Sequence, residues 1–261
     1  MSDTLLVEDV EPGIRVITLN RPGVLNAWNA EMRKRMAEVV AELPGADLRA
    51  VVIAGNGRAF SAGEDVRGME ALADDSTRGF RAVARHIHDV FDGIEALEVP
   101  VIAAVEGVAA GGGLELALSC DFRVVSRSAR LGLPELNVGL IPGSGGCSRL
   151  VRLVGLARAK EIVMLEGMMP AERAHQLGLV TRLVEPGAAL DGALEMAREL
   201  KAKAPLAVGM AKLVLNSCAE ADLELGRRFE RLGQSVLKKT GDHLEGVRAF
   251  VEKRQPEWKA R

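Results

Sequence analysis

The first third of the chain alternates between strand-like and helix-like hydrophobic patterns. Residues 5–10 and 14–19 are strand-like, and the Pro12-Gly13 turn between them predicts a β-hairpin. Apolar residues at helical spacing predict a helix capped by Asn29 and running to about residue 43. Its predicted buried face comprises Met32, Met36, Val39, Val40 and Leu43. Residues 48–54 predict a further strand, which we expect to pair in parallel with the second strand through a right-handed crossover.

A continuous apolar run occupies the middle of the sequence. Residues 99–105 predict a strand buried on both faces, and residues 77–97 ahead of it predict a long amphipathic helix. The glycines at 111–113 then open a short apolar helix in which Glu115 is the only charged residue. The rest of the chain is organised around this strand, glycine run and helix.

The glycine run and Glu115 together predict chemistry at the start of that helix. Glycine lets a ligand approach the backbone, and the first N–H groups of a helix lack intrahelical acceptors. These donors and the helix dipole suit a negatively charged oxygen. Glu115 lies three residues beyond Gly112, so its carboxylate is expected one turn away as a candidate base. The alternative for Glu115 alone is a solvated acid that favours the dipole.

A second acid, Glu135, precedes a second glycine-rich segment. Glu135 follows Pro134 in an otherwise apolar stretch, and residues 139–146 open another helix. The alternative for Glu135 alone is an exposed loop acid. As a pair beside two glycine loops, Glu115 and Glu135 suggest acid–base chemistry on a substrate whose oxygen becomes anionic. Neither glycine run completes a dinucleotide-binding or Walker motif, so nucleotide phosphates held in those ways are not supported.

Residues 58–67 form a turn of small residues after a strand. A nucleophile elbow is excluded because Ala59 stands where that motif requires glycine. Two interpretations remain open: a connecting loop with a helix cap at Asp65, or a backbone N–H presented beside Gly63.

The chain from residue 155 onward is mostly helical in pattern. Helices are expected near 156–166, 170–176, 189–203, 205–219, 222–237 and 243–253. The fold class is therefore α/β, with a core domain at 1–195 and a C-terminal helical region at 196–261. We expect the apolar helices of this region to bury against a second copy of the chain.

Composition narrows the class of protein. The 261 residues and 48% hydrophobic content suffice for a full core, and a net charge of −2 predicts neither nucleic acid nor a membrane as partner. Three cysteines do not form a disulfide framework, and His86 and His88 cannot share a helix face as metal ligands. With no signal or membrane-spanning pattern, the expectation is a soluble cytoplasmic protein without a metal.

Five stretches of the sequence, in their order and spacing, resemble the motifs of one protein family. They are residues 19–22 (LNRP), 58–65 (RAFSAGED), 111–117 (GGGLELA), 134–135 with 139–143 (PE and GLIPG) and 178–180 (GLV). Through them the chain resembles the enoyl-CoA hydratase/isomerase (crotonase) superfamily over essentially its whole length, and is most similar to an enoyl-CoA hydratase. The resemblance implies a spiral of ββα repeats and a C-terminal helical region that builds trimers, commonly paired into hexamers.

The resemblance also implies an activity and the residues that perform it. The backbone N–H groups of Glu64 and Gly112 would hold the thioester oxygen, Glu115 would activate water and Glu135 would supply the proton to the α-carbon. With both acids present, the implied reaction is hydration of a trans-2-enoyl-CoA to a 3-hydroxyacyl-CoA. No cofactor is implied, because coenzyme A is part of the substrate.

Coenzyme A contacts follow from the resemblance as well. The implied contacts in the same subunit are Leu25, Ala62, Glu64, Asp65, Val66, Arg67 and Gly112. Phe250 and Lys253 would reach the nucleotide from a neighbouring subunit, although charge pattern alone makes Lys253 a solvated helix-end cation.

Two departures from the family pattern and one absence leave alternatives open. Gly23 stands where many relatives carry a basic residue near the phosphates, and Glu64 replaces a small or apolar residue. The lack of tyrosine disfavours branches that use a catalytic tyrosine. The alternatives to the hydratase are a double-bond isomerase, a specialised hydratase for a branched or cyclic acyl-CoA, and a non-catalytic acyl-CoA binder.

Overall fold

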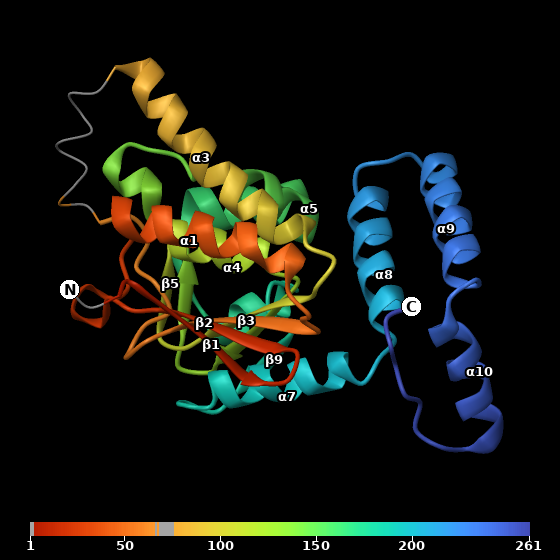
Figure 1. Ribbon diagram of the computed structural model, residues 1–261. Coiled ribbons are helices and arrows are strands. Elements are labelled where there is room, and N and C mark those ends of the chain that lie inside the picture. Colours follow the sequence, from red (N-terminus) through yellow and green to blue (C-terminus); the bar gives the residue numbers. More distant parts are fainter. Residues whose placement is uncertain (1–2, 66, 68–75) are drawn as a thin grey trace.

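A six-stranded sheet forms the centre of the computed structural model, which describes residues 3–65, 67 and 76–261 (Figure 1). The strand order is β1-β2-β3-β4-β6-β9. The strands are β1 (Leu5–Glu11), β2 (Ile14–Leu19), β3 (Ala50–Gly55), β4 (Val101–Val105), β6 (Phe122–Ser126) and β9 (Arg182–Val184). β1 and β2 form the expected antiparallel hairpin, and all later pairs in this sheet are parallel. The predicted hairpin and the predicted parallel pairing of β2 with β3 are thus confirmed.

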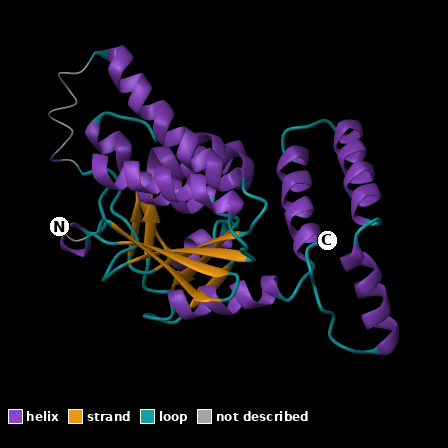
Figure 2. Ribbon diagram, viewed as in Figure 1, coloured by secondary structure: helices purple, strands orange, loops and turns teal. Residues whose placement is uncertain are grey.

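The two faces of this sheet bury alternate side chains of the same strands. In β3, Val51 and Ile53 face one hydrophobic cluster while Val52 faces the other. One cluster lies under α1 (Ala30–Glu42), α3 (Thr77–Ala96), α4 (Gly112–Ser119) and α5 (Gly146–Glu161), and the other lies under α7 (Ala189–Lys201). Figure 2 shows these helices in layers on opposite sides of the strands. Burial on both sides explains why β4 is apolar at every position.

A second, smaller sheet lies beside the first and was not predicted in full. It contains β5 (Val108–Ala110), β7 (Arg130–Gly132) and β8 (Met168–Pro170). Isolated parallel bridges from Ser61 to Ala109 and from Glu64 to Trp28 extend it. Strands of three residues carry too little periodicity to be read from sequence. This sheet places residues 61–64 next to the start of α4.

The helix predictions agree closely with the structure. Asn29 accepts a hydrogen bond from the Met32 backbone N–H and caps α1, and the five residues of its predicted face are all buried. The predicted helix at 156–166 begins earlier, as α5 at Gly146, and Gly155 interrupts it with a non-helical backbone. The remaining short elements are α6 (Ala171–Gln176), 3-10 helices at Pro22–Val24, Leu43–Gly45 and Pro134–Val138, and a π-helix at Ile162–Glu166. No described helix is long and apolar enough to cross a membrane.

The C-terminal helices stand apart from the sheet. These are α8 (Pro205–Cys218), α9 (Leu223–Leu237) and α10 (Gly241–Glu252) (Figure 1). The predicted core boundary at 195/196 falls inside α7, and Met196 and Ala197 of that helix pack on the sheet. The core therefore continues to the end of α7.

α8 is joined to the core by a buried ion pair. Lys212 Nζ lies 2.8 Å from Asp121 Oδ2, and both side chains are largely shielded from solvent. Asp121 Oδ2 also accepts a hydrogen bond from the Val101 backbone N–H. Burial raises the pKa of the Asp121 carboxyl, and the Lys212 charge opposes that effect. One carboxylate thus connects α8 to the start of the central strand β4.

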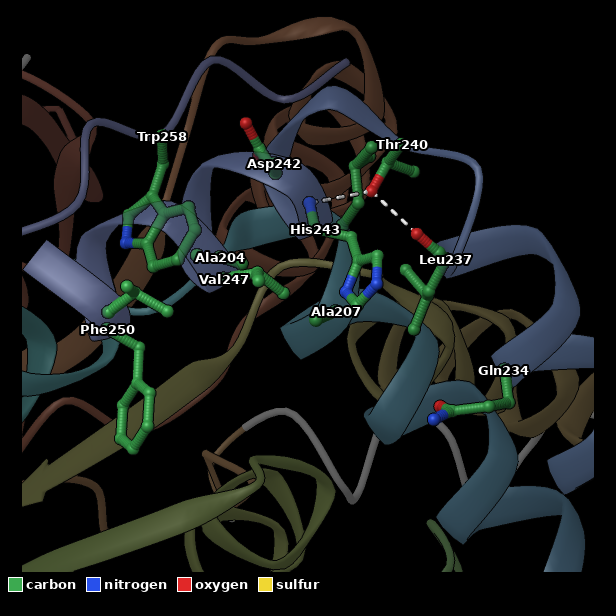
Figure 3. Close-up of a pocket in the computed structure, with 13 residues that line it drawn as sticks. Ala204, Ala207, Gln234, Leu237, Thr240, Asp242, His243, Val247, Phe250 and Trp258 are labelled. Atoms are coloured by element: carbon green, nitrogen blue, oxygen red, sulfur yellow. Dashed lines mark hydrogen bonds between the residues drawn. The ribbon is translucent and has the colours of Figure 1, made fainter.

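A cavity of about 420 Å³ lies among the C-terminal helices. Figure 3 shows Trp258, Val247 and Phe250 around it, with Thr240 Oγ1 hydrogen-bonded to the Leu237 carbonyl oxygen and the His243 N–H. Phe250 is 86% exposed. Other exposed apolar residues of these helices are Leu215, Leu223, Leu232, Val236, Leu244 and Val251. A large apolar surface of α8–α10 is therefore uncovered in the single chain.

Candidate active site

A cavity of about 360 Å³ brings the two predicted acids together. Glu115 on α4 and Glu135 on the 3-10 helix Pro134–Val138 both line it. Gly112 and Glu64 line it as well. Its apolar wall includes Ala62, Ala84, Ile87, Val138, Leu140 and Ile141. Three stretches of the chain that are distant in sequence, at Glu64, Gly112–Glu115 and Glu135, therefore line one cavity.

Glu115 is held at one of its two carboxylate oxygens. The residue is 2% exposed, and its Oε1 accepts hydrogen bonds from the backbone N–H groups of Ser144 (2.7 Å) and Gly146 (2.8 Å). Burial raises the pKa of the Glu115 carboxyl, and these two hydrogen bonds oppose the rise. The second glycine loop thus orients Glu115, and Oε2 is left facing the Gly112 side of the cavity.

Glu135 has a different environment. Its Oε2 is buried and has no hydrogen-bond partner among the described residues. Burial, with a smaller contribution from the nearby Glu115 charge, raises the pKa of the Glu135 carboxyl to about 7. Such a carboxyl is protonated in a large share of molecules near neutral pH and can donate a proton there.

Gly112 offers an unused donor at the start of α4. The first intrahelical hydrogen bond of α4 runs from the Glu115 N–H to the Gly111 carbonyl oxygen, so the Gly112 N–H has no acceptor within the helix. The Gly111 N–H donates to the Gly132 carbonyl oxygen and ties this end of the helix to β7. The Gly112 N–H therefore points outward at the positive end of the helix dipole.

Glu64 offers a second unused donor. In its parallel bridge with Trp28, the Trp28 N–H donates to the Gly63 carbonyl oxygen and the Asp65 N–H donates to the Trp28 carbonyl oxygen. In this parallel pattern the groups that bond to Trp28 belong to Gly63 and Asp65, the residues before and after Glu64. The Glu64 N–H is therefore directed away from Trp28. In the hydrogen bonds between described residues, neither this N–H nor that of Gly112 has an acceptor.

The two donors face the same small volume. A Cβ placed on Gly112 would lie 4.0 Å from the Glu64 nitrogen and 4.0 Å from Glu115 Oε2. Gly63 makes this approach possible, since its φ is +88° and a Cβ there would lie 2.7 Å from the Ala110 carbonyl oxygen and 3.1 Å from the Gly112 nitrogen. For residues 58–67, the structure has the Glu64 N–H beside Gly63 without an acceptor among the described residues, as one interpretation expected. The helix that Asp65 would cap in the other interpretation falls largely on residues outside the described part of the chain.

His88 was not predicted to take part in the site. Its Nε2 on α3 lies 2.6 Å from the carbonyl oxygen of Gly143, one residue before the Ser144 amide that holds Glu115. Gly146 is equally constrained, because a Cβ there would lie 2.9 Å from Glu115 Oε1. No sequence signal identified His88, since its partner is a backbone carbonyl 55 residues away.

The residues predicted to contact coenzyme A in the same subunit do not all lie at the cavity. Ala62 and Glu64 line it with Gly112, whereas Leu25, Asp65 and Arg67 are outside its lining. The Leu25 carbonyl oxygen accepts a hydrogen bond from the Ala62 N–H. Val66 lies outside the described residues.

Asp65 is engaged by arginines rather than by the cavity. Its carboxylate pairs with Arg67 at 2.9 Å and with Arg21 at 3.2 Å. These contacts, with Arg67 the larger, hold the pKa of the Asp65 carboxyl at about 2. The Asp65 carboxylate thus joins the Arg21 and Arg67 guanidinium groups outside the cavity lining.

Phe250 and Lys253 are not part of the cavity within one chain. Phe250 belongs to α10 and lines the separate cavity of Figure 3. Lys253 is the left-handed residue that follows α10, with φ of +53°. Their predicted role in a neighbouring subunit stays a prediction.

Comparison with known proteins shows which family this chain is similar to. The profile of the Enoyl-CoA hydratase/isomerase family matches residues 9–261. The chain belongs to this family. It is 37% identical to the short-chain-enoyl-CoA hydratase of Clostridium acetobutylicum over 254 residues, which cover 97% of this chain and 96% of that protein. It is 42% identical to a probable enoyl-CoA hydratase of Rhizobium meliloti over 266 aligned positions, which cover 99% of each.

A solved structure extends this similarity to the fold. The crystal structure of an enoyl-CoA hydratase from Bacillus anthracis matches with a TM-score of 0.94 at 34% identity, covering 99% of this chain and 100% of that one. The two-sheet core and the C-terminal helices are thus the crotonase fold, as the sequence resemblance implied. The protein is a crotonase-family enzyme, and enoyl-CoA hydratases of this family need no cofactor.

Proposed function

We propose that this crotonase-family enzyme is an enoyl-CoA hydratase that adds water to a trans-2-enoyl-CoA and gives a 3-hydroxyacyl-CoA. The single observation that carries the proposal is the cavity in which two differently tuned glutamates face two unused backbone donors. The names of the similar proteins support the same activity.

The backbone donors would stabilise the negative charge that forms on the thioester oxygen. When a nucleophile adds to C3 of a 2-enoyl thioester, electrons move to the thioester oxygen and form an enolate. The N–H groups of Glu64 and Gly112 would donate to that oxygen, and both are fixed by the backbone before substrate binds. Removal of one such donor typically lowers a rate by about a hundred- to a thousandfold.

The two acids would transfer the protons that the addition of water requires. Glu115, oriented through Oε1, would use its other oxygen to take a proton from water as the water oxygen bonds to C3. Glu135, with a pKa of about 7, would give its proton to C2 as the enolate collapses. The reaction leaves Glu115 protonated and Glu135 ionised, so one proton must return through solvent or between the two groups before the next turnover.

The alternative activities share this cavity. A double-bond isomerase also passes through a thioester enolate, and a specialised hydratase would differ only in the acyl group it accepts. Ile87, Val138 and Leu140 give the cavity an apolar wall that suits an acyl chain without fixing its length. A non-catalytic binder would not require two raised carboxyl pKa values beside an anion site.

The proposal includes assembly into a homotrimer or a pair of trimers. The apolar side chains exposed on α8–α10 support it, because a surface of this size is seldom left in water. In such an assembly Phe250 and Lys253 of one copy would reach the coenzyme A site of another. Light scattering coupled to size-exclusion chromatography measures the mass, and a monomer at micromolar concentration would contradict the assembly.

Turnover assays test the proposed activity. Purified protein should hydrate crotonyl-CoA, followed by loss of the absorbance of the conjugated thioester, and product analysis should show 3-hydroxybutyryl-CoA. E115Q and E135Q should each fold and bind coenzyme A esters while losing most of the activity. Faster conversion of 3-enoyl than of 2-enoyl thioesters would favour the isomerase, and acyl-CoA binding without turnover on a panel of enoyl-CoA esters would favour the binder.

A further inference from the structure

An ion pair lies in the wall of the cavity beside the two backbone donors. The Arg33 guanidinium on α1 pairs with the carboxylate of Glu64, the residue whose N–H faces the cavity. The Arg33 side chain is 14% exposed and that of Glu64 is 30% exposed. Both residues line the cavity together with Glu115 and Glu135.

The charges around this cavity are unbalanced. Among the described residues that line it, the acids are Glu64, Glu115 and Glu135, and Arg33 is the only cation. The proposed reaction places a further negative charge on an oxygen held by the Glu64 N–H. A carboxylate on the side chain of that same residue would oppose this charge if it had no partner.

We infer that Arg33 is a positioning residue for the anion site: its guanidinium pairs with the Glu64 carboxylate, fixes the segment that presents the Glu64 N–H, and balances a negative charge that would otherwise oppose the enolate. This inference rests on the proposed hydratase function. Arginine suits the role because it stays charged at all ordinary pH values and its planar group holds a carboxylate in a defined geometry. The inference also gives a physical reason why an acid is tolerated at position 64, beside a site for an anion.

Coulomb's law sets the scale of the effect. At an effective dielectric constant of about 20, two unit charges roughly 7 Å apart interact strongly enough to change a rate by about 10- to 100-fold. The enzyme–substrate complex carries no enolate charge before the addition step, so the loss should appear in kcat more than in KM.

A double-substitution cycle separates charge balance from simple loss of a contact. R33M leaves the Glu64 carboxylate without its partner and should lower kcat for crotonyl-CoA by about 10- to 100-fold. E64A removes the acid but keeps the N–H and should lower kcat less than R33M does, since the segment loses its contact but no carboxylate opposes the enolate. R33M/E64A should regain most of the activity lost in R33M, and R33K should lose less than R33M.

The same helix offers a matched control. Arg35 pairs with Glu38 on the exposed side of α1, so R35M makes the same change of charge outside the cavity and should leave kcat unchanged. Thermal melting of each variant shows whether it is folded. The inference is overturned if folded R33M retains wild-type kcat, or if R33M/E64A is as slow as R33M.

A binding measurement keeps the inference distinct from the proposed function. Acetoacetyl-CoA ionises to an enolate, whereas butyryl-CoA does not. By calorimetry, R33M should weaken binding of acetoacetyl-CoA much more than binding of butyryl-CoA, and E64A should restore it. If wild type hydrates no enoyl-CoA but shows this pattern, the hydratase proposal fails and the role of Arg33 at an anion site stands. If wild type is active and R33M weakens both ligands equally, only the role of Arg33 fails.

Discussion

His88 Nε2 lies 2.6 Å from the carbonyl oxygen of Gly143, and the next residue, Ser144, donates its N–H to Glu115 Oε1. A side chain of α3 therefore anchors the loop that orients the candidate base on α4. The contact involves a ring nitrogen and a backbone carbonyl, so the nitrogen acts as the donor.

Loss of this anchor should reduce catalysis without removing a catalytic group. H88A frees the Gly143 carbonyl and should lower kcat for hydration by about 5- to 100-fold, because a small displacement of an oriented group is costly. H86A is the matched control, since His86 lies on the same helix and is exposed. Steady-state kinetics on the two variants provides the measurement. Equal kcat values for H88A and H86A would contradict the anchoring role.

The raised pKa of Glu135 predicts a pH profile. If Glu135 donates the proton in hydration, kcat/KM should fall as pH rises through about 7, because the protonated form is then lost. E135Q should be much slower and should lack this alkaline limb. A wild-type profile that stays flat between pH 6 and pH 9 would contradict Glu135 as the donor; those limits bracket roughly one to two pH units around its pKa.

The same pKa predicts an effect on stability. A carboxyl has an ordinary pKa of about 4.3, so the folded protein binds more protons than the unfolded chain between about pH 4.3 and pH 7. The contribution of Glu135 to stability is then complete below its unfolded pKa and is lost as pH rises through about 7. E135Q should melt at a higher temperature than wild type at pH 8, with a smaller difference at pH 5. Differential scanning calorimetry tests this, and a lower melting temperature for E135Q at pH 8 would count against it.

Neighbouring glycines of α4 should respond differently to alanine. In G112A the new methyl group finds ordinary contact distances of 3.8 to 4.0 Å, but it occupies the space in front of the Glu64 N–H. We expect kcat/KM to fall by about a hundredfold or more with little change in stability. In G113A the methyl group would lie 2.4 Å from the Ser61 carbonyl oxygen. That variant should lose about 1–3 kcal/mol of unfolding free energy.

Urea unfolding and crotonyl-CoA kinetics on both glycine variants separate the two effects. A folded G112A with wild-type kcat/KM would show that the oxygen does not bind where the two donors meet. A G113A variant as stable as wild type would show that α4 and the Ser61 segment are less tightly packed than the structure indicates.

The Lys212–Asp121 ion pair should hold α8 to the core. K212M leaves the Asp121 carboxylate buried without its cation and should destabilise the protein by about 3–5 kcal/mol. D121N/K212M should recover part of that loss, because no uncompensated charge remains. Chemical unfolding measures both values, and a K212M variant as stable as wild type would refute the coupling.

The sequence was informative wherever a property is local. The spacing of hydrophobic residues predicted the β1–β2 hairpin, and the same spacing with the Asn29 cap predicted α1. A half-buried strand has a hydrophobic residue at every second position, and a helix has one at every third or fourth position, so both patterns can be seen in the sequence. The short strands β5, β8 and β9 left no such trace. The boundary predicted at 195/196 falls within α7 for a related reason, since the sequence of a helix is similar whether the helix packs on a sheet or extends away from it.

The candidate site was predicted in its residue types and decided in its geometry by the fold. Glu115, Glu135 and the glycine runs are visible in the sequence because an acid in an apolar segment and a glycine-opened helix are chemically unusual. Only the tertiary structure brings the Glu64 and Gly112 amides to one point, gives the two glutamates different environments, and adds Arg33 and His88 to their surroundings. These relationships join residues distant in sequence through backbone groups and burial, which the order of side chains does not encode locally.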